Sequence, residues 1–380
     1  MRLNIWLGLV VTALLSSSVF AADNIKFNGF ASVVSGIDLK DEHADSDYSN
    51  ETFDNMPESR LALQMTAQLE DGVRFIGQAV ARGDAEEGFV SNYEWAYFDF
   101  NVGSGGKLKA GRVRVPFYKY SDYLDVGYAY HWIKPPEAQY AISFRNADGV
   151  GYSQNFQMGS MDSNVTALYG RYQGTLTIGG LPSSGEIRNL MGVRWSLNAG
   201  SNELYASYWQ GDCIIPSALL SGVAAALAPA GVAATDVEID GDLCYFYGGG
   251  YKGTFGNFGL HAEAGTIDIE DSAYAQFAGG FIGGTYQMGD YLLHLTYEMT
   301  TLSEEEYDPA PGAMASTGGE ITNIIVGVRK DIGFSSAVKF EVHQYDTSEG
   351  YKPANVAAAA HSSDDEYSAT IVKVAFDTMF

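Results

Sequence analysis

The stretch Leu108–Tyr140, LKAGRVRVPFYKYSDYLDVGYAYHWIKPPEAQY, decides how the rest of the chain is interpreted. At its start Arg112 and Arg114 occupy alternate positions, so a β-strand would place both on one face. Pro116 then removes a backbone donor and ends regular pairing. The remainder has no periodicity and carries three carboxylates: Asp122, Asp125 and Glu137. If residues 117–140 fold back inside a barrel, these carboxylates face the wall arginines across water, and the stretch predicts the constriction of a pore.

The N-terminus has the pattern of a secretory signal. Arg2 supplies the positive charge, Ile5–Leu15 is an apolar core, and small residues precede a cleavage point after Ala21. The sequence therefore predicts a signal peptide over residues 1–21 and a single domain over residues 22–380. A retained anchor is the alternative, although the apolar core is too short to span a bilayer as a helix.

Composition is compatible with a membrane barrel. The mean hydropathy is only −0.08, yet aromatic residues make up 13% of the chain and glycine accounts for 44 of its 380 residues. Strands that alternate lipid-facing with water-facing residues give this average, and tyrosine suits the interfacial girdles. A secreted soluble β-protein could share the composition. The net charge of −25 excludes the basic surface that nucleic-acid binding requires, and it favours a weak cation preference that the wall arginines oppose.

Alternating segments recur along the whole chain. In residues 60–69, RLALQMTAQL, every second residue is apolar, so these apolar side chains share one face of a strand. Counted with their turns, such segments number about sixteen, and short turns alternate with longer loops as at the two ends of an outer-membrane barrel. The last segment, residues 367–380, ends on Phe380. The fold prediction is an all-β transmembrane antiparallel barrel of about sixteen strands with an inward-folded third loop. On the predicted inner face lie polar residues that include His261, Glu263, His294, Glu298, Lys339, Glu341 and His343.

Two cysteines enclose an apolar loop. Cys213 and Cys244 are the only cysteines, and a secreted chain matures in an oxidising compartment, so we expect a disulfide, with two free thiols as the alternative. Residues 217–235 between them are rich in alanine and uncharged. Pro229 and the glycines favour a short helix within an external loop rather than a membrane span.

The sequence lacks the common motifs of catalytic nucleophiles and of metal sites. The chain has no G-x-S-x-G nucleophile motif, no H-E-x-x-H and no C-x-x-C. We therefore expect no enzymatic activity, no metal and no cofactor, although some outer-membrane barrels are enzymes.

The order of these features resembles the general porins of Gram-negative bacteria over the whole mature length. The resemblance depends on the signal peptide, the strand rhythm, the terminal Phe380, and Ala110-Gly111-Arg112 followed by Pro116 and Tyr118. The start of the second strand, Glu58-Ser59-Arg60-Leu61, also resembles the position of a pore-wall arginine. The resemblance implies a homotrimer in the outer membrane, in contact with lipopolysaccharide, whose water-filled channel passes ions and small hydrophilic solutes by diffusion.

Site residues follow from the same resemblance. Arg60, Arg112 and Arg114 would be wall cations, and Asp122, Asp125 and Glu137 would be loop anions. Arg74 and Arg82 share the predicted inner face and are further candidates. Opposed charges across a narrow water-filled gap orient polar solutes and bias ion choice. The alternative is that some of these pairs merely hold the loop in place.

The loop departs from the usual porin pattern because it is unusually aromatic. Its rings could stack on a solute, and the candidates are Tyr120, Tyr123, Tyr130 and Trp132. That possibility implies a substrate-preferring channel for oligosaccharides or for aromatic or organic acids. The alternative is that the rings pack the loop against the wall. A third class of function is a surface adhesin or phage receptor.

Overall fold

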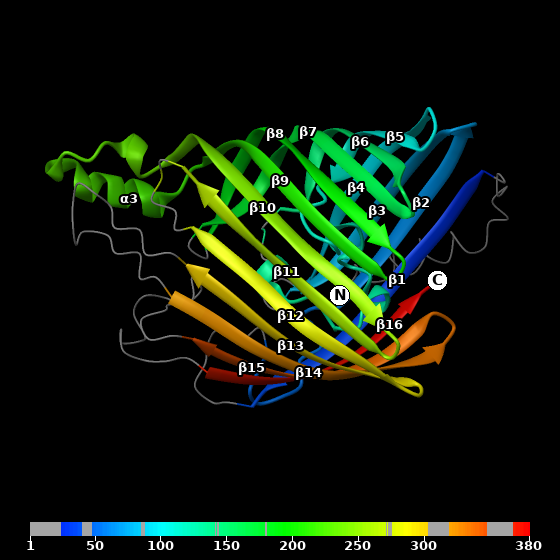
Figure 1. Ribbon diagram of the computed structural model, residues 1–380. Coiled ribbons are helices and arrows are strands. Elements are labelled where there is room, and N and C mark those ends of the chain that lie inside the picture. Colours follow the sequence, from blue (N-terminus) through cyan, green and yellow to red (C-terminus); the bar gives the residue numbers. More distant parts are fainter. Residues whose placement is uncertain are drawn as a thin grey trace, which may run out of the picture.

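A computed structural model describes residues 24–39, 48–84, 88–140, 142, 144–178, 181–270, 272, 276–302, 319–347 and 368–380. In this part of the chain sixteen antiparallel strands follow one another around a closed ring (Figure 1). The ring closes where the first strand, β1, pairs with the last, β16, through partners that run from Phe30↔Met379 to Asp38↔Ile371. The predicted antiparallel barrel of about sixteen strands is confirmed.

The strands in order are β1 (Ile25–Asp38), β2 (Arg60–Glu70), β3 (Val73–Asp84), β4 (Gly88–Val102), β5 (Gly106–Arg114), β6 (Asn146–Met158), β7 (Met161–Ile178), β8 (Leu181–Ala199), β9 (Asn202–Ile215), β10 (Ile239–Phe255), β11 (Phe258–Ile269), β12 (Phe277–Met288), β13 (Tyr291–Leu302), β14 (Gly319–Gly333), β15 (Ser336–Thr347) and β16 (Ser368–Met379).

The β7–β8 hairpin extends beyond the part of its sequence in which polar and apolar residues alternate. The alternation ends near Tyr172, but the two strands stay paired as far as Ile178↔Leu181. A break in register between Gly170 and Tyr172 shifts which side chains share a face. Such an irregularity erases the period of two on which the prediction depended, so the hairpin extends through residues that carried no signal.

Burial around the ring is inside out. On β2, Leu61 and Leu63 are 52% and 53% exposed. Arg60, at the start of the same strand, is only 6% exposed. On β15, Lys339 and Glu341 are fully buried while Val338 and Phe340 are exposed. Apolar residues outside and charged residues inside are the arrangement of a barrel that spans a membrane. The predicted inner-face set, from His261 to His343, is buried in the interior.

The apolar loop forms a separate lobe at one end of the ring. Its helix α3 (Ala218–Leu227) begins at Ser217, whose side chain accepts a hydrogen bond from the Leu220 amide. Ala224, Leu227, Val232 and Val237 pack together as a small core of the lobe. Figure 1 shows α3 beyond the strand ends. The short helix is confirmed, and within the described residues no helix is both long enough and apolar enough to cross a membrane.

Cys213 and Cys244 form a disulfide at the base of this lobe, with their Cα atoms 5.8 Å apart. The predicted pairing is confirmed. The bridge joins β9 to β10 and closes a loop between two cysteines that are 31 residues apart in the sequence.

The predicted signal peptide, residues 1–21, lies outside the described residues, so the division into residues 1–21 and 22–380 stays a prediction.

Removing the disulfide is expected to loosen the lobe without affecting the interior of the ring. Closing a loop of this length is worth about 4 kcal/mol in the chain-entropy model. The double substitution Cys213→Ser and Cys244→Ser should therefore speed proteolytic cleavage within residues 216–238 at least tenfold while single-channel conductance stays the same. Equal cleavage rates before and after the substitution would contradict the anchoring role of the bridge.

Candidate functional site

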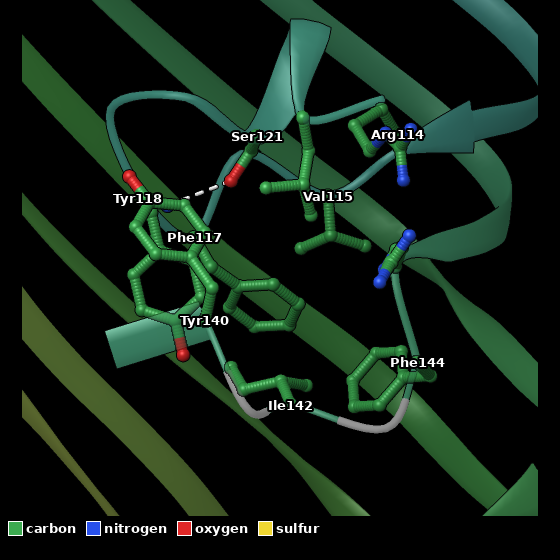
Figure 2. Close-up of a pocket in the computed structure, with 10 residues that line it drawn as sticks. Arg114, Val115, Phe117, Tyr118, Ser121, Tyr140, Ile142 and Phe144 are labelled. Carbon is green, nitrogen blue, oxygen red and sulfur yellow. Dashed lines mark hydrogen bonds between the residues drawn. The ribbon is translucent and has the colours of Figure 1, made fainter. Parts of the chain in front are cut away.

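The connection between β5 and β6, residues 115–145, is the β5–β6 segment, and it has little regular structure. It contains two 3-10 turns, η1 (Ser121–Tyr123) and η2 (Gly127–Ala129), and one helical turn, α2 (Glu137–Tyr140). At its start the Ser121 hydroxyl accepts a hydrogen bond from the Tyr118 amide at 2.8 Å, which folds the chain back after Pro116 (Figure 2). A segment with so few internal bonds must satisfy its backbone elsewhere.

Carboxylates of distant strands accept hydrogen bonds from backbone amides of the segment. Glu263 on β11 accepts from the Lys119 amide at 3.1 Å. Glu341 on β15 accepts from Ile133 at 2.8 Å, and Glu298 on β13 accepts from Ala138 at 2.9 Å. Charge-assisted bonds of this kind are about twice as strong as neutral ones. The segment is thus attached to strands far around the ring from β5 and β6.

Cations of the wall bind carbonyls of the same segment. Lys339 on β15 donates to Gly127 at 2.7 Å and to Trp132 at 2.5 Å. Arg329 on β14 donates to the carbonyls of Tyr128 and Tyr130 at 2.7 and 2.6 Å. These wall charges hold the backbone of the segment, whatever side chains the segment carries.

Arg60 on β2 belongs to the same group of backbone-binding cations. It donates to the Ile133 carbonyl at 3.0 Å and to the Tyr130 hydroxyl at 2.9 Å. Within the described residues no carboxylate lies within ion-pair distance of Arg60. Its predicted place in the wall is consistent with the structure, but its partner is the backbone of the β5–β6 segment and not one of the loop acids.

Asp125 is the centre of a buried charge cluster. It pairs with Arg82 at 2.6 Å and with Arg114 and Arg145 at 3.2 Å each. Glu94 pairs with Arg82 at 2.6 Å and Arg114 at 2.7 Å. Burial by itself would raise the pKa of Asp125, but the guanidiniums of Arg82, Arg145 and Arg114 more than offset it and hold that pKa well below its usual range. Arg82, Arg114 and Asp125, all predicted as site residues, therefore meet.

Arg112 does not join Arg114, so the prediction that both line the inner wall is wrong. Arg112 pairs at 2.9 Å with Asp148, and both side chains are more than 40% exposed. It lies on the same face as Ala110, whose cross-strand partners Phe98 and Val150 are exposed apolar residues. This is the outer face. Arg114 is the last residue of β5, where pairing ends before Pro116 and alternation no longer fixes the direction of a side chain.

Three other predicted residues also lie apart from the Asp125 cluster. Glu137 pairs with Lys134 at 2.5 Å and is half exposed. Asp122 is exposed and makes no ion pair with any residue that the structure describes. Arg74 pairs with Asp99 at the short-turn end of β3 and β4. The prediction placed several acids opposite several arginines. In the structure a single loop acid, Asp125, pairs with three arginines.

The aromatic residues of the segment pack instead of lining an open space. Tyr120, Tyr130 and Trp132 are 2%, 4% and 0% exposed, and only Tyr123 of the four stacking candidates keeps part of its ring exposed. Trp132 donates to the Thr296 hydroxyl at 2.9 Å and meets Phe281 edge to face. Because their faces are covered, Tyr120, Tyr130 and Trp132 cannot stack on a solute in this conformation.

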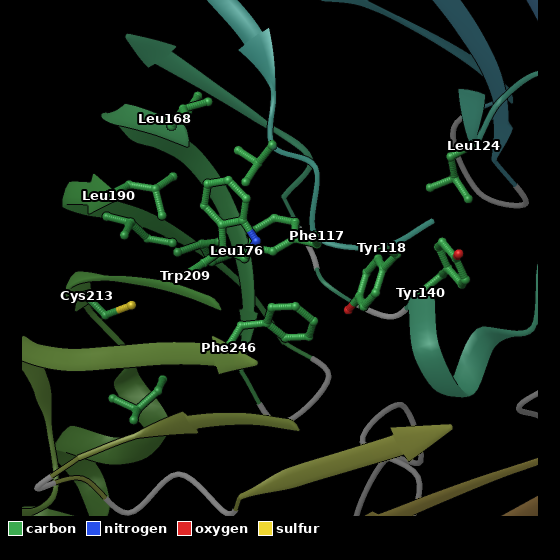
Figure 3. Packing of buried hydrophobic residues seen from close by; sticks show 14 of the residues in the cluster. Phe117, Tyr118, Leu124, Tyr140, Leu168, Leu176, Leu190, Trp209, Cys213 and Phe246 are labelled. Atoms are coloured by element: carbon green, nitrogen blue, oxygen red, sulfur yellow. The ribbon is translucent and has the colours of Figure 1, made fainter. Parts of the chain in front are cut away.

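A second group of rings fixes the start of the segment to the wall. Phe117 meets Trp209 and Phe246 edge to face, with ring centroids 5.8 and 5.3 Å apart. Figure 3 shows these rings together with Tyr118 and Tyr140 between the segment and the strands β9 and β10. Aromatic pairs of this kind contribute about 0.5–1.5 kcal/mol each beyond burial. The aromatic content of the segment is explained by this attachment.

Sequence reasoning missed several residues that carry the attachment. Glu94 and Arg145 complete the Asp125 cluster, and His131 lies buried with its ring centroid 4.8 Å from that of His261 and 5.0 Å from that of His294. Burial, together with His294 and His261, lowers the pKa of His131 well below its usual value. The alternation in the sequence places Lys339 and Glu341 on the inner face, but it does not predict their contacts with the segment. Within the described residues no group of side chains has the arrangement of a metal site.

No family model and no curated protein sequence matches the chain. Solved structures do match it along nearly its whole length. The outer-membrane channel DcaP of Acinetobacter baumannii aligns with a TM-score of 0.61 and 11% identity, covering 94% of this chain and 97% of its own. The anion-selective porin of Comamonas acidovorans aligns with a TM-score of 0.57 and 15% identity, covering 94% and 99%.

A third structure, the loop L8 deletion mutant of the outer-membrane protein OmpT of Vibrio cholerae, aligns with a TM-score of 0.57 and 11% identity, covering 94% and 99%. Identities this low relate the folds and leave the roles of single residues open. The closed ring of sixteen strands agrees with the fold of these structures. The protein therefore has the sixteen-stranded fold of the outer-membrane porins of Gram-negative bacteria.

Proposed function

We propose that the protein is a channel of the outer membrane of a Gram-negative bacterium, through which ions and small hydrophilic solutes diffuse passively. The observation that carries the proposal is the closed ring with a charged interior and an apolar exterior. A ring of this strand number is wide enough to leave an aqueous passage, and its apolar outer face suits lipid.

Partly exposed guanidiniums inside the ring support a water-filled passage. The side chains of Arg74, Arg82 and Arg145 are 38%, 27% and 31% exposed. Each of these arginines pairs with a carboxylate and still leaves part of its guanidinium exposed inside the ring, where water can solvate the charge. Water beside the β5–β6 segment is the medium in which a solute would move.

The β5–β6 segment would narrow this passage. Its contacts with β2 on one side and with β11, β13, β14 and β15 on the other support a course through the interior of the ring. In this account most wall charges fix the segment, and the exposed sides of Arg82 and Arg145 face the solutes. Fixed charges at a narrowing orient water and polar solutes.

The partners follow from the same account. Lipopolysaccharide and other outer-membrane lipids would surround the apolar exterior, and the protein would assemble as a homotrimer. A Vibrio cholerae OmpT structure of the same fold is described as a trimer form. We assign no enzymatic reaction and no nucleic-acid partner to the protein.

Liposome swelling tests the proposed function. Purified protein in phospholipid vesicles should admit a pentose faster than a disaccharide, and a disaccharide faster than a trisaccharide, because passage depends on size. Empty vesicles and vesicles with heat-denatured protein are the controls. A swelling rate equal to that of empty vesicles for every sugar would exclude a diffusion channel. Fast uptake of one sugar regardless of size would replace it with a substrate-preferring channel.

A further inference from the structure

The inner wall carries an excess of positive charge at its short-turn end, although the whole chain is strongly acidic. Three cations surround a single carboxylate there: Lys119 of the β5–β6 segment, Arg194 of β8 and Lys252 of β10 around Glu203 of β9. We call these four residues the cationic cluster. Lys119 forms an ion pair with Glu203, and Arg194 approaches the same carboxylate at 3.6 Å. Lys252 is the direct cross-strand partner of Glu203.

The cluster lies on the interior side of the wall. Ser207, the cross-strand partner of Arg194, donates to the Phe117 carbonyl of the segment at 2.7 Å. On the other side His261, the cross-strand partner of Lys252, bonds the Tyr120 hydroxyl at 3.0 Å. Both neighbours therefore touch the β5–β6 segment, and side chains in register with them share their face.

The positive charge of the cluster is only partly compensated. Within the described residues Lys252 has no carboxylate within ion-pair distance, and the buried Nε of Arg194 has no hydrogen-bond partner. The Arg194 guanidinium lies 4.8 Å from the centre of the Tyr205 ring, which fixes it in place. Glu203 pairs with Lys119 and Arg194, so the ammonium group of Lys252 is left to attract an anion.

The same excess recurs on the neighbouring wall. Asp99 of β4 is the cross-strand partner of both Arg74 and Lys109, but it forms an ion pair with Arg74. Lys109 lies 5.2 Å from the centre of the Tyr97 ring. The exposed Asp122 is the opposing charge nearby. Glu263 of β11, which accepts hydrogen bonds from the Lys119 amide and the Tyr205 hydroxyl, is a further carboxylate beside the cluster. Five cations therefore face Glu203, Asp99, Glu263 and the exposed Asp122, which leaves a small excess of positive charge.

We propose that the cationic cluster is an anion-binding subsite of the passage and that the channel consequently prefers small anions over cations. The inference deepens the proposed function and depends on it. Salt screens acidic residues that lie more than about 10 Å from the passage at 0.1 M. Charges on the wall of the passage act at contact distance and decide which ion enters.

The reversal potential of the purified protein in a planar bilayer, under a tenfold KCl gradient at pH 7, tests the proposal. The wild-type protein should show a potential of the sign that chloride preference gives. Lys252→Glu should lower the chloride-to-potassium permeability ratio by roughly threefold or more, as expected for a wall charge that steers ions. Arg194→Gln should shift the ratio in the same direction by less.

Lys330→Glu is the matched control because it makes the same change of charge on β14, where Lys330 bonds the Tyr291 hydroxyl outside the ring. It should leave the ratio unchanged. Potassium preference in the wild-type protein, or an equal shift from Lys330→Glu and Lys252→Glu, would overturn the anion subsite and leave the channel intact. A bilayer without any channel current would overturn the proposed function, and the subsite with it.

Discussion

Asp125→Asn is expected to release the first half of the β5–β6 segment and to make single-channel currents larger and noisier. Asp125 is the carboxylate shared by Arg82, Arg114 and Arg145, and Arg114 is only 8% exposed. In Asp125→Asn, Arg145 loses its ion pair with Asp125, whereas Arg82 and Arg114 keep only the one carboxylate of Glu94. Loss of a partner that leaves a charge fully buried and unpaired costs about 3–5 kcal/mol, so we expect a cost below that range. Asparagine keeps the size of the side chain, so the effect reports charge and not a cavity.

Asp148→Asn is the control for this prediction. Asp148 also pairs with an arginine, Arg112, but both side chains are exposed on the outer face. An exposed pair contributes about 0–1 kcal/mol, so conductance and noise should stay at the wild-type level. Hydrogen exchange at residues 117–130 gives a second readout, with faster exchange in Asp125→Asn only. If Asp125→Asn leaves both current and exchange unchanged, the Asp125 cluster does not hold the segment.

Lys339→Met is expected to have the second large effect, on the far side of the ring. The substitution keeps an apolar stem of similar length and removes the ammonium group that binds the carbonyls of Gly127 and Trp132. It also leaves Asp377 buried without the ion pair that it makes with Lys339 at 2.8 Å. Loss of one partner from a buried pair again costs about 3–5 kcal/mol. The segment should detach from β15, and the mean conductance should rise.

The matched control is Lys330→Met on β14, which changes the same residue type outside the ring. It removes an exposed hydrogen bond to the Tyr291 hydroxyl and the cation–π contact with the Tyr291 ring, both outside the ring of strands, so conductance should not change. Far-UV circular dichroism shows whether either variant keeps the barrel. A folded Lys339→Met protein with wild-type conductance would mean that the passage does not run beside this part of the segment.

The strands could be predicted because residues in a barrel wall face lipid and the interior alternately, so every second residue is apolar. In residues 60–69 the alternation alone predicts the strand and its apolar face, and β2 agrees to within one residue. Alternation fails where pairing is irregular or stops. It assigned Arg112 to the interior because Arg114 seemed to share its face, whereas Arg114 leaves the strand at its last residue.

The contacts of the β5–β6 segment could not be predicted from the sequence. Lys339, Arg329 and Glu341 bind backbone groups of the segment. Every residue type offers the same carbonyl, and every type except proline offers the same amide. The contacts between the wall and the segment therefore require no particular residue types in the segment, and its sequence gives no sign of them. The aromatic content of the segment was evident, but composition does not tell a packed ring from one that faces a solute. Trp132, which is fully buried, shows the first outcome.

We infer that a water-filled passage runs through the ring beside a fixed segment. Single-channel recording of the wild-type protein in a planar bilayer measures this passage. We expect discrete steps, in groups of three equal sizes for a trimer, whose conductance rises in proportion to KCl concentration without saturating. A bilayer that stays silent, or currents without defined steps, would contradict a passage of this kind.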